Sequence, residues 1–221
     1  MFKYSVSTQF NRSDFILGFL SMTYVTMVVL SIVLFDQILH FSLFGMPMTL
    51  SGAVVPYVFL YPISFIVLRV YGLRQVNNMI ACMILVSLLF VLMATLVAKW
   101  SSNTTGIHDI LMSSIKMYIA GFIGMPAGIY TSFLVLKWFA KMKVGFNVFS
   151  LTIATIVGEV INTVIVFPVG FHGQYSLPQI IGAIILDALI FKIVMGAILA
   201  VVAIMIIHFL INKKVYGVQE K

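Results

Sequence analysis

Residues 146–171 read FNVFSLTIATIVGEVINTVIVFPVGF, an apolar run that carries one carboxylate, Glu159, about midway along it. An α-helix needs roughly 20 predominantly apolar residues to cross the hydrocarbon core of a bilayer, which is about 30 Å thick. The run is long enough for that crossing, so we predict a transmembrane helix here. A carboxylate at that depth is costly and is typical of a functional position.

The rest of the chain repeats this pattern. Of its 221 residues, 62% are apolar and 9% are charged, and its mean hydropathy is +1.15. A soluble domain carries roughly 25% charged residues, because water covers its surface. The apolar runs therefore predict an all-α membrane protein with six transmembrane helices in a single polytopic domain, residues 1–221. The other five runs cover 15–35, 50–68, 76–98, 117–139 and 179–211.

Several of these segments have features of their own. The run 15–35 is longer than the core of a signal peptide, about 7–15 residues, and has no small-residue cleavage site, so we predict an uncleaved first helix. Pro56 and Pro62 should kink or break the second helix, because proline donates no backbone hydrogen bond. Residues 99–116 are predicted to form a polar loop. The last run would measure about 50 Å as one helix, so it must tilt, protrude or begin with an interfacial turn.

The basic residues predict the orientation. Of 13 Lys and Arg residues, ten lie in the tails and loops of one side and two in the loops of the other. Because cytoplasmic loops are enriched in Lys and Arg, we expect both termini in the cytoplasm. The ten are Lys3, Arg12, Arg69, Arg74, Lys137, Lys141, Lys143, Lys213, Lys214 and Lys221; Lys99 and Lys116 lie opposite, and Lys192 lies within the last run.

Several function classes find no support in the residues. The net charge of +7 is spread over the loops without an arginine-rich or aromatic-interleaved patch, so no nucleic-acid partner is predicted. Cys82 is the only cysteine, and the four histidines are scattered without ligand spacing, so we predict no disulfide, no metal site and no cofactor. The chain has no Gly-x-x-x-x-Gly-Lys-Ser/Thr loop and no His-Glu-x-x-His motif, which argues against ATP hydrolysis and against an enzyme.

Three charged residues stand out well inside the apolar runs: Glu159, Asp187 and Lys192. Each charge at the bilayer centre costs roughly 2.5–3.5 kcal/mol, so we expect these side chains to face the bundle interior or a wet cavity. Asp187 and Lys192 are five positions apart, about 140° around a helix, and are poorly placed to pair with each other. We therefore expect pairing between helices, for example Lys192 with Glu159 or Asp187 with Asn162. A structural counter-ion role for Lys192 and an interfacial position for Asp187 are the alternatives.

The fifth run carries a polar stripe. Thr152, Thr155, Glu159, Asn162 and Thr163 are spaced so that they share one helix face. Glu159 lies at the depth where transporters place substrate sites, and a carboxylate beside an amide can bind the polar edge of a flat heterocycle. The alternative interpretation is that these groups only join neighbouring helices, as Ser and Thr often do in membranes.

Short motifs in the second, fifth and sixth runs point to a known family. Residues 154–163 read ATIVGEVINT, which is similar to a small-Thr-x-x-Gly/Ser-Gln/Asn-x-x-Asp-Thr stretch of the bacterial queuosine-precursor transporter family, also called the vitamin uptake transporter family. Asp187 and Lys192 resemble that family's Asp-x-x-x-Lys helix, here with one extra residue in the spacing. The resemblance covers most of 45–214 and has the same six-helix layout. The residues of this chain that resemble the family's second helix are Gly52-Ala53, Pro56 and Arg69-Val70-Tyr71-Gly72.

The resemblance implies uptake of a 7-deazaguanine, such as 7-cyano-7-deazaguanine or its aminomethyl relative, across the inner membrane. Asn162 and Thr163 fall on the family's Asp-Thr pair, Glu159 on the amide position before it, and Lys192 on the family lysine. Two acidic positions of the family are lost, so a changed substrate is an open alternative. The losses fall in the second helix, where this chain has Ile63, Ser64 and Phe65, and in the fourth, where residues 135–138 read VLKW.

We expect a secondary or facilitative importer of a small planar solute. Glu159 and Asn162 would bind its polar edge, Lys192 would balance the buried charge, and Tyr57 or Tyr61 would stack on it, unless these tyrosines belong to an interfacial belt. Two alternatives are a substrate-capture subunit of a separate ATP-driven importer and a non-transporting membrane scaffold. The expected partners are the solute and the lipid bilayer, and a homo-oligomer or an energising subunit is left open. The candidate substrate-binding residues are Tyr57, Tyr61, Thr155, Glu159, Asn162, Thr163, Asp187 and Lys192.

Overall fold

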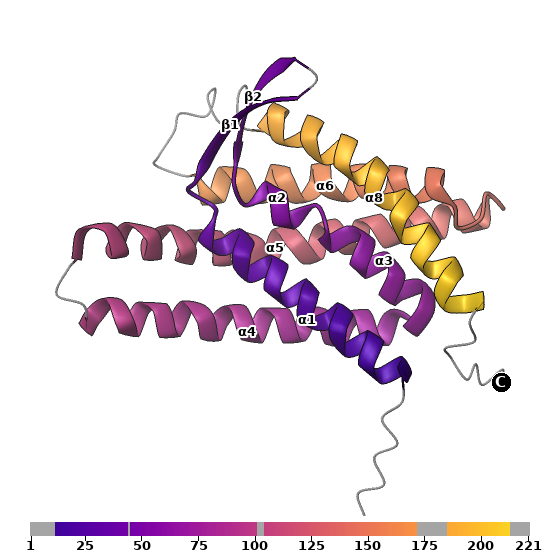
Figure 1. The fold of residues 1–221 in the computed structure, drawn as a ribbon, viewed down its shortest axis with the longest axis horizontal. Coiled ribbons are helices and arrows are strands. Elements are labelled where there is room, and N and C mark those ends of the chain that lie inside the picture. Colours follow the sequence, from indigo (N-terminus) through magenta and orange to yellow (C-terminus); the bar gives the residue numbers. More distant parts are fainter. Residues whose placement is uncertain (1–11, 44, 101–103, 172–184, 213–221) are drawn as a thin grey trace, which may run out of the picture.

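The computed structural model describes residues 12–43, 45–100, 104–171 and 185–212. Figure 1 shows long helices that run across the molecule, with a two-stranded hairpin against one part of them. With α2 and α3 counted as one span, six helices among the described residues are long and apolar enough to cross a membrane, which agrees with the predicted number. The helices are α1 (Arg12–Val33), α2 (Val54–Tyr57), α3 (Leu60–Tyr71), α4 (Leu73–Trp100), α5 (Thr104–Lys141), α6 (Val148–Gly170) and α8 (Leu186–Asn212).

The prediction that the chain is all-α is wrong for residues 38–43 and 46–51. They form an antiparallel hairpin of β1 (Ile38–Leu43) and β2 (Met46–Ser51), in which Ile38 lies opposite Ser51. Gly45, in the connection, has a φ of 82°, a left-handed conformation that glycine adopts without a steric penalty. The predicted start of the second helix at residue 50 is also wrong. Leu50, near the end of β2, is as apolar as the residues of the helix after it, so hydropathy alone does not mark the boundary.

The second span is broken, as its two prolines indicated. α2 is a single turn, and α3 begins at Leu60 after the two residues that follow it. Pro56 and Pro62 each lie in the first turn of their helix, where a backbone N–H has no partner within the helix and its absence costs little. Residues 60–67 of α3 are all buried. This helix therefore lies at the centre of the bundle, as is typical of a helix that is apolar all round.

The predicted polar loop at 99–116 is wrong. α4 continues to Trp100, and α5 begins at Thr104. With 38 residues, α5 is about 57 Å long, whereas the hydrocarbon core of a bilayer is about 30 Å thick. Figure 1 shows the connected ends of α4 and α5 projecting together beyond the other helices. The polar composition of this segment is thus compatible with a helix that continues outside the apolar layer.

Contacts between the connections show which ends of the helices lie together. The Tyr71 hydroxyl donates to the Ser13 carbonyl at 3.0 Å, and the Arg69 guanidinium lies 5.7 Å from the centroid of the Phe146 ring. The start of α1, the end of α3 and the connection from α5 to α6 therefore share one end of the bundle. The hairpin and the start of α8 lie towards the other end (Figure 1). Residues 179–184, the predicted beginning of the last helix, lie outside the described residues.

Candidate functional site

Glycines bring α5, α6 and α8 close enough to bury the polar stripe of α6. Where α5 crosses α6, a Cβ on Gly128 or on Gly158 would lie 2.7 Å from the carbonyl oxygen of the other, so neither position accepts a larger residue without a shift. On the α8 side, a Cβ on Gly196 would lie 2.9 Å from the Cγ2 of Thr155. Small residues commonly permit such close approach between membrane helices. The stripe residues that become buried are Thr155, Glu159, Asn162 and Thr163, while Thr152 is half-buried.

A buried ion pair joins α6 to α8. The Lys192 Nζ donates to Glu159 Oε2 at 2.8 Å and to Thr163 Oγ1 at 3.0 Å. Both charged side chains are only 2% exposed. The predicted pairing of Lys192 with Glu159 is therefore confirmed. The second carboxylate oxygen, Glu159 Oε1, is buried and has no hydrogen-bond partner among the described residues.

Aromatic rings surround the ammonium group. The Lys192 Nζ lies 4.9 Å from the centroid of the Tyr57 ring and 5.7 Å from that of the Phe167 ring, within the range of cation–π attraction. The Tyr57 hydroxyl donates to Asn162 Oδ1 at 3.0 Å, which ties α2 to α6. Tyr57 thus contacts the lysine through its ring and the asparagine through its hydroxyl.

Tyr61 takes a different position from Tyr57. It lies against Gly128 and Gly158, at the crossing of α5 and α6. Its hydroxyl is buried and has no hydrogen-bond partner among the described residues. Tyr61 is therefore packed where α3 meets the crossing of α5 and α6. Gly158, which it contacts, directly precedes Glu159 in α6.

Asp187 binds the hairpin. Its Oδ2 accepts a hydrogen bond from the Thr49 backbone N–H at 2.7 Å. The predicted pairing of Asp187 with Asn162 is wrong, because Asp187 is bonded to Thr49 of the hairpin, while Asn162 is bonded to Tyr57 of α2. Asp187 lies in the first turn of α8, where the unpaired N–H groups of a helix stabilise a negative charge. The structure therefore brings this residue to the hairpin rather than to the cavity beside the ion pair.

A small cavity lies beside the ion pair. Its empty volume is about 210 Å³, and Tyr57, Asn162 and Lys192 supply the polar groups of its lining. Val166 and Phe167 are among the apolar residues around them. Lys192 uses two of its three N–H donors on protein partners, so one is left for a ligand, and an asparagine amide nitrogen carries two more donors. The cavity thus offers hydrogen-bond donors between apolar walls.

Sequence reasoning missed Phe167 as a site residue. It follows Thr163 by four positions and Glu159 by eight, so it continues the same face of α6 towards the hairpin. The signal was therefore present in the spacing. A stripe defined by polarity alone ends at Thr163, its last polar residue, and leaves out Phe167.

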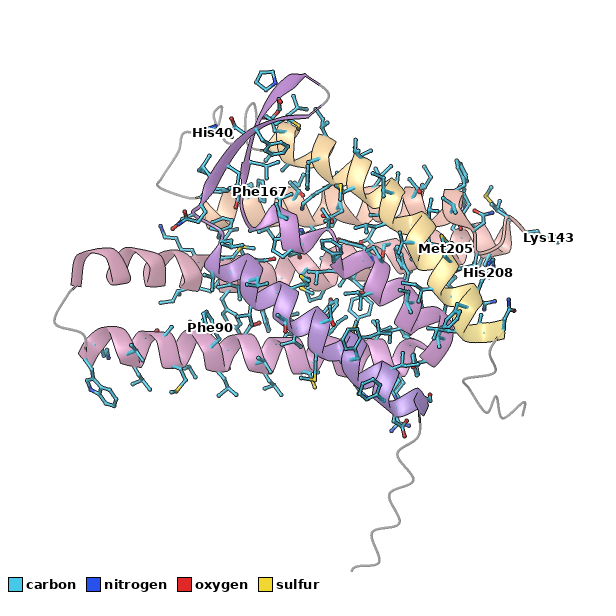
Figure 2. All side chains as sticks on the ribbon, in the orientation of Figure 1. His40, Phe90, Lys143, Phe167, Met205 and His208 are labelled. Atoms are coloured by element: carbon cyan, nitrogen blue, oxygen red, sulfur yellow. The ribbon has the colours of Figure 1, made fainter. Side chains whose placement is uncertain are left out.

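Potential metal ligands are dispersed in the part of the chain that the structure describes. Figure 2 shows His40 on the hairpin and His208 near the far end of α8. The described residues contain no group of three or more His, Cys, Asp or Glu that could hold a metal ion. Cys82 is exposed on α4. The side chain of His108 and the whole of His172 lie outside what the structure describes.

Comparison with known proteins gives one match. The family model described as "Putative vitamin uptake transporter" matches residues 51–207. That range contains α2 to α6 and most of α8, and with them the ion pair and the cavity beside it. No curated protein sequence and no solved structure matches the chain.

Proposed function

This chain belongs to the vitamin uptake transporter family, and we propose that it imports a small planar solute across a bacterial inner membrane. The solute we propose is a 7-deazaguanine, such as 7-cyano-7-deazaguanine. The observation that carries the proposal is the Glu159–Lys192 ion pair, buried within an apolar bundle beside a cavity that Lys192 itself lines.

Stability alone does not account for this ion pair. Each charge costs roughly 2.5–3.5 kcal/mol at the centre of a bilayer. Replacement of a buried ion pair by well-packed apolar residues is often neutral or even stabilising in proteins. A folded bundle could therefore dispense with Glu159 and Lys192. Their presence beside a cavity supports a role in binding a polar solute.

The donors and acceptors fit the polar edge of a guanine-like ring. That edge carries one carbonyl oxygen, which accepts, next to a ring N–H and an amino group, which donate. The third N–H of Lys192 and the amide of Asn162 are donors for the carbonyl oxygen. Glu159 Oε1 has no partner among the described residues and is an acceptor for the two N–H groups. Because Glu159 is not among the residues that line the cavity, we propose that its side chain shifts when the solute binds.

The walls of the cavity suit the flat faces of such a ring. Tyr57 and Phe167 both line it, and their rings already lie against a cation. An aromatic face can exchange that contact for stacking on a heterocycle. We propose that Tyr57 provides this stacking, whereas Tyr61 packs at the helix crossing.

Uptake into cells tests the proposal. The chain is expressed in a bacterium that cannot make queuosine and lacks its own importer, and queuosine in tRNA is measured at low external 7-cyano-7-deazaguanine. Wild type should restore queuosine, and Glu159→Gln should not. Asp187→Asn is the matched control, because it makes the same carboxylate-to-amide change at the hairpin contact and should preserve uptake.

The outcomes separate the functional alternatives. Wild-type uptake by Glu159→Gln, with equal amounts in the membrane, would remove Glu159 from the site. If wild-type protein is present in the membrane but queuosine in tRNA is not restored, the proposed solute is wrong. Purified protein that binds the solute tightly but does not import it into liposomes would instead indicate a capture subunit for a separate energising module.

We also propose that both termini face the cytoplasm. The structure places the start of α1, the end of α3 and the connection from α5 to α6 at one end of the bundle. Arg69, Arg74, Lys137, Lys141 and Lys143 belong to that end by their positions in the chain. The enrichment of Lys and Arg on the cytoplasmic side supports this orientation.

A further inference from the structure

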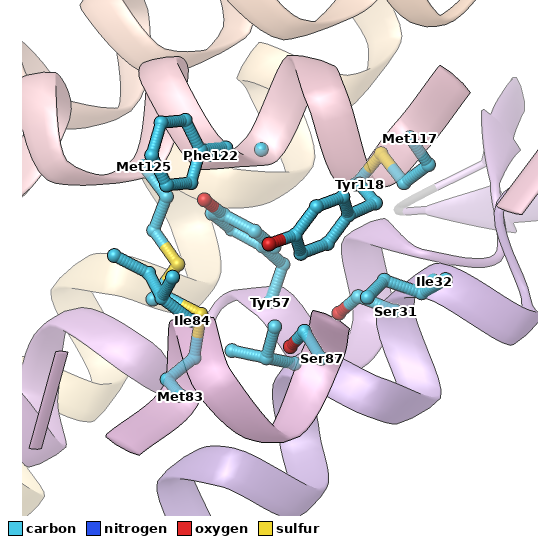
Figure 3. Close-up of a pocket in the computed structure, with 12 residues that line it drawn as sticks. Ser31, Ile32, Tyr57, Met83, Ile84, Ser87, Met117, Tyr118, Phe122 and Met125 are labelled. Carbon is cyan, nitrogen blue, oxygen red and sulfur yellow. The ribbon is translucent and has the colours of Figure 1, made fainter. Parts of the chain in front are cut away.

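A second and larger cavity lies across Tyr57 from the ion pair. Its empty volume is about 350 Å³, and residues of α1, α4 and α5 form most of its wall. Figure 3 shows Met83 and Ser87 on α4 facing Tyr118 and Met125 on α5, with Tyr57 behind them. We call this space the methionine chamber.

The methionine chamber and the cavity at the ion pair share part of their lining. Tyr57 and Met117 line both of them. Tyr57 therefore lies against both spaces, held by its hydrogen bond to Asn162. A solute that reaches from one space into the other must displace this ring, and the hydrogen bond to Asn162 is then lost.

The sizes of the two cavities differ in a way that matters for a ligand. The empty volume is about 210 Å³ at the ion pair and about 350 Å³ in the methionine chamber. The charged group, Lys192, thus lines the smaller space, and more of the room is in the larger one.

The lining of the methionine chamber suits a flat ring with little polarity. Met83, Met117 and Met125 present flexible, polarizable thioethers, which adapt their shape and make favourable contacts with aromatic rings. Ser87 is 1% exposed, and its Oγ has no hydrogen-bond partner among the described residues. A lipid acyl chain has no polar atom to satisfy this hydroxyl. A heterocycle carries ring and substituent atoms that do.

We propose that the methionine chamber is a second part of the solute site. The polar edge of the solute binds at Lys192 and Asn162, while its apolar face or a ring substituent enters the methionine chamber past Tyr57. The ligand class is a neutral planar nitrogen heterocycle with one polar atom in reach of Ser87. This inference rests on the proposed function, because both spaces are assigned to the same solute.

Filling the methionine chamber is the test. Gly121 lines it, and a Cβ at this position would meet no atom within 4 Å, so Gly121→Leu adds volume to the space without a clash at its first atom. Gly18 on α1 is the matched control, because its Cβ would also meet no atom within 4 Å and it does not line the chamber. The dissociation constant of 7-cyano-7-deazaguanine is measured by calorimetry on the purified full chain, and initial uptake is measured in cells.

Gly121→Leu should weaken binding and uptake by about tenfold or more, since a change of one methylene in an apolar pocket already alters discrimination by about tenfold. Gly18→Leu should match wild type, and Gly121→Ala should fall between the two. If Gly121→Leu does not reach the membrane, Ser87→Ala decides, because it removes the hydroxyl and adds no volume to the side chain. It too should weaken binding.

Wild-type affinity in Gly121→Leu, or in Ser87→Ala where that variant decides, overturns the inference and leaves the proposed function intact. A Gly121→Leu protein that loses a copurifying lipid but keeps its affinity for the solute would show that an acyl chain fills the space, which also overturns it. Absence of binding to wild type removes the proposed function itself, and the inference with it.

Discussion

Replacement of Lys192 by Met should lower the free energy of unfolding by about 3–5 kcal/mol, the usual cost of removing one partner of a buried ion pair. Methionine keeps much of the length of the side chain and removes its charge, so that Glu159 stays buried at 2% exposure without a counter-ion. The hydrogen bonds alone do not supply this magnitude, because polar contacts between membrane helices average about 0.6 kcal/mol each. The uncompensated carboxylate decides the effect.

The double variant Glu159→Gln with Lys192→Met separates stability from transport. It buries no charge, so its cost should fall to that of the two lost hydrogen bonds of Lys192, about 1 kcal/mol. Unfolding is followed by detergent titration in bicelles, and uptake is followed in cells for the same proteins. We expect the double variant to recover stability but not uptake.

Two results would refute this reasoning. If Lys192→Met were no less stable than the double variant, the two charges could not be buried as a pair. If the double variant imported solute as wild type does, the pair would have no part in transport, as the scaffold alternative predicts.

Three smaller perturbations test other contacts. Gly128→Ala should destabilise the protein by about 1–3 kcal/mol, because its Cβ would lie 2.7 Å from a carbonyl oxygen of α6. The Cβ of Gly18→Ala would meet open space, so this variant should be as stable as wild type. Thermal unfolding of the two variants tests the difference. Asp187→Ala should speed amide hydrogen exchange in β1 and β2, because it removes a charged acceptor worth about 1.5–3 kcal/mol from a hairpin N–H, and unchanged exchange would contradict that role. In a background without the native cysteine, Met142→Cys should react with a membrane-impermeant thiol reagent only when the reagent is added on the cytoplasmic side, and Leu39→Cys only when it is added on the outer side. The reverse pattern would overturn the proposed orientation.

The number of spans and the polar face of α6 could be predicted because lipid imposes simple constraints. A helix must satisfy its own backbone and present apolar side chains to the bilayer, so both features appear in short windows of sequence. The same constraint predicted the ion pair. Asp187 and Lys192 point in different directions on one helix, so the lysine required a partner on another helix, and Glu159 was the acidic residue at a suitable depth.

The features that escaped prediction depend on contacts between distant segments. The hairpin reads as apolar sequence, and its pairing becomes visible only when β1 and β2 lie side by side. The position of Asp187 depends on a backbone N–H of β2, 138 positions earlier in the chain. The methionine chamber is formed where α1, α4 and α5 fail to fill the space between them, which no residue in isolation reveals.

The hairpin also bears on how the proposed solute would reach the ion pair. The outer edges of a two-stranded sheet carry unpaired N–H and C=O groups, which hydrocarbon cannot satisfy, so this part of the molecule belongs at a water boundary or against protein. Phe41 of β1 touches Phe191, the residue before Lys192, with ring centroids 5.9 Å apart. Beyond Lys192, α8 continues for about 30 Å. Because Glu159, the ion-pair partner of Lys192, lies midway along α6, the hairpin covers the proposed site on one side, and we expect it to move against α8 when a solute passes on that side.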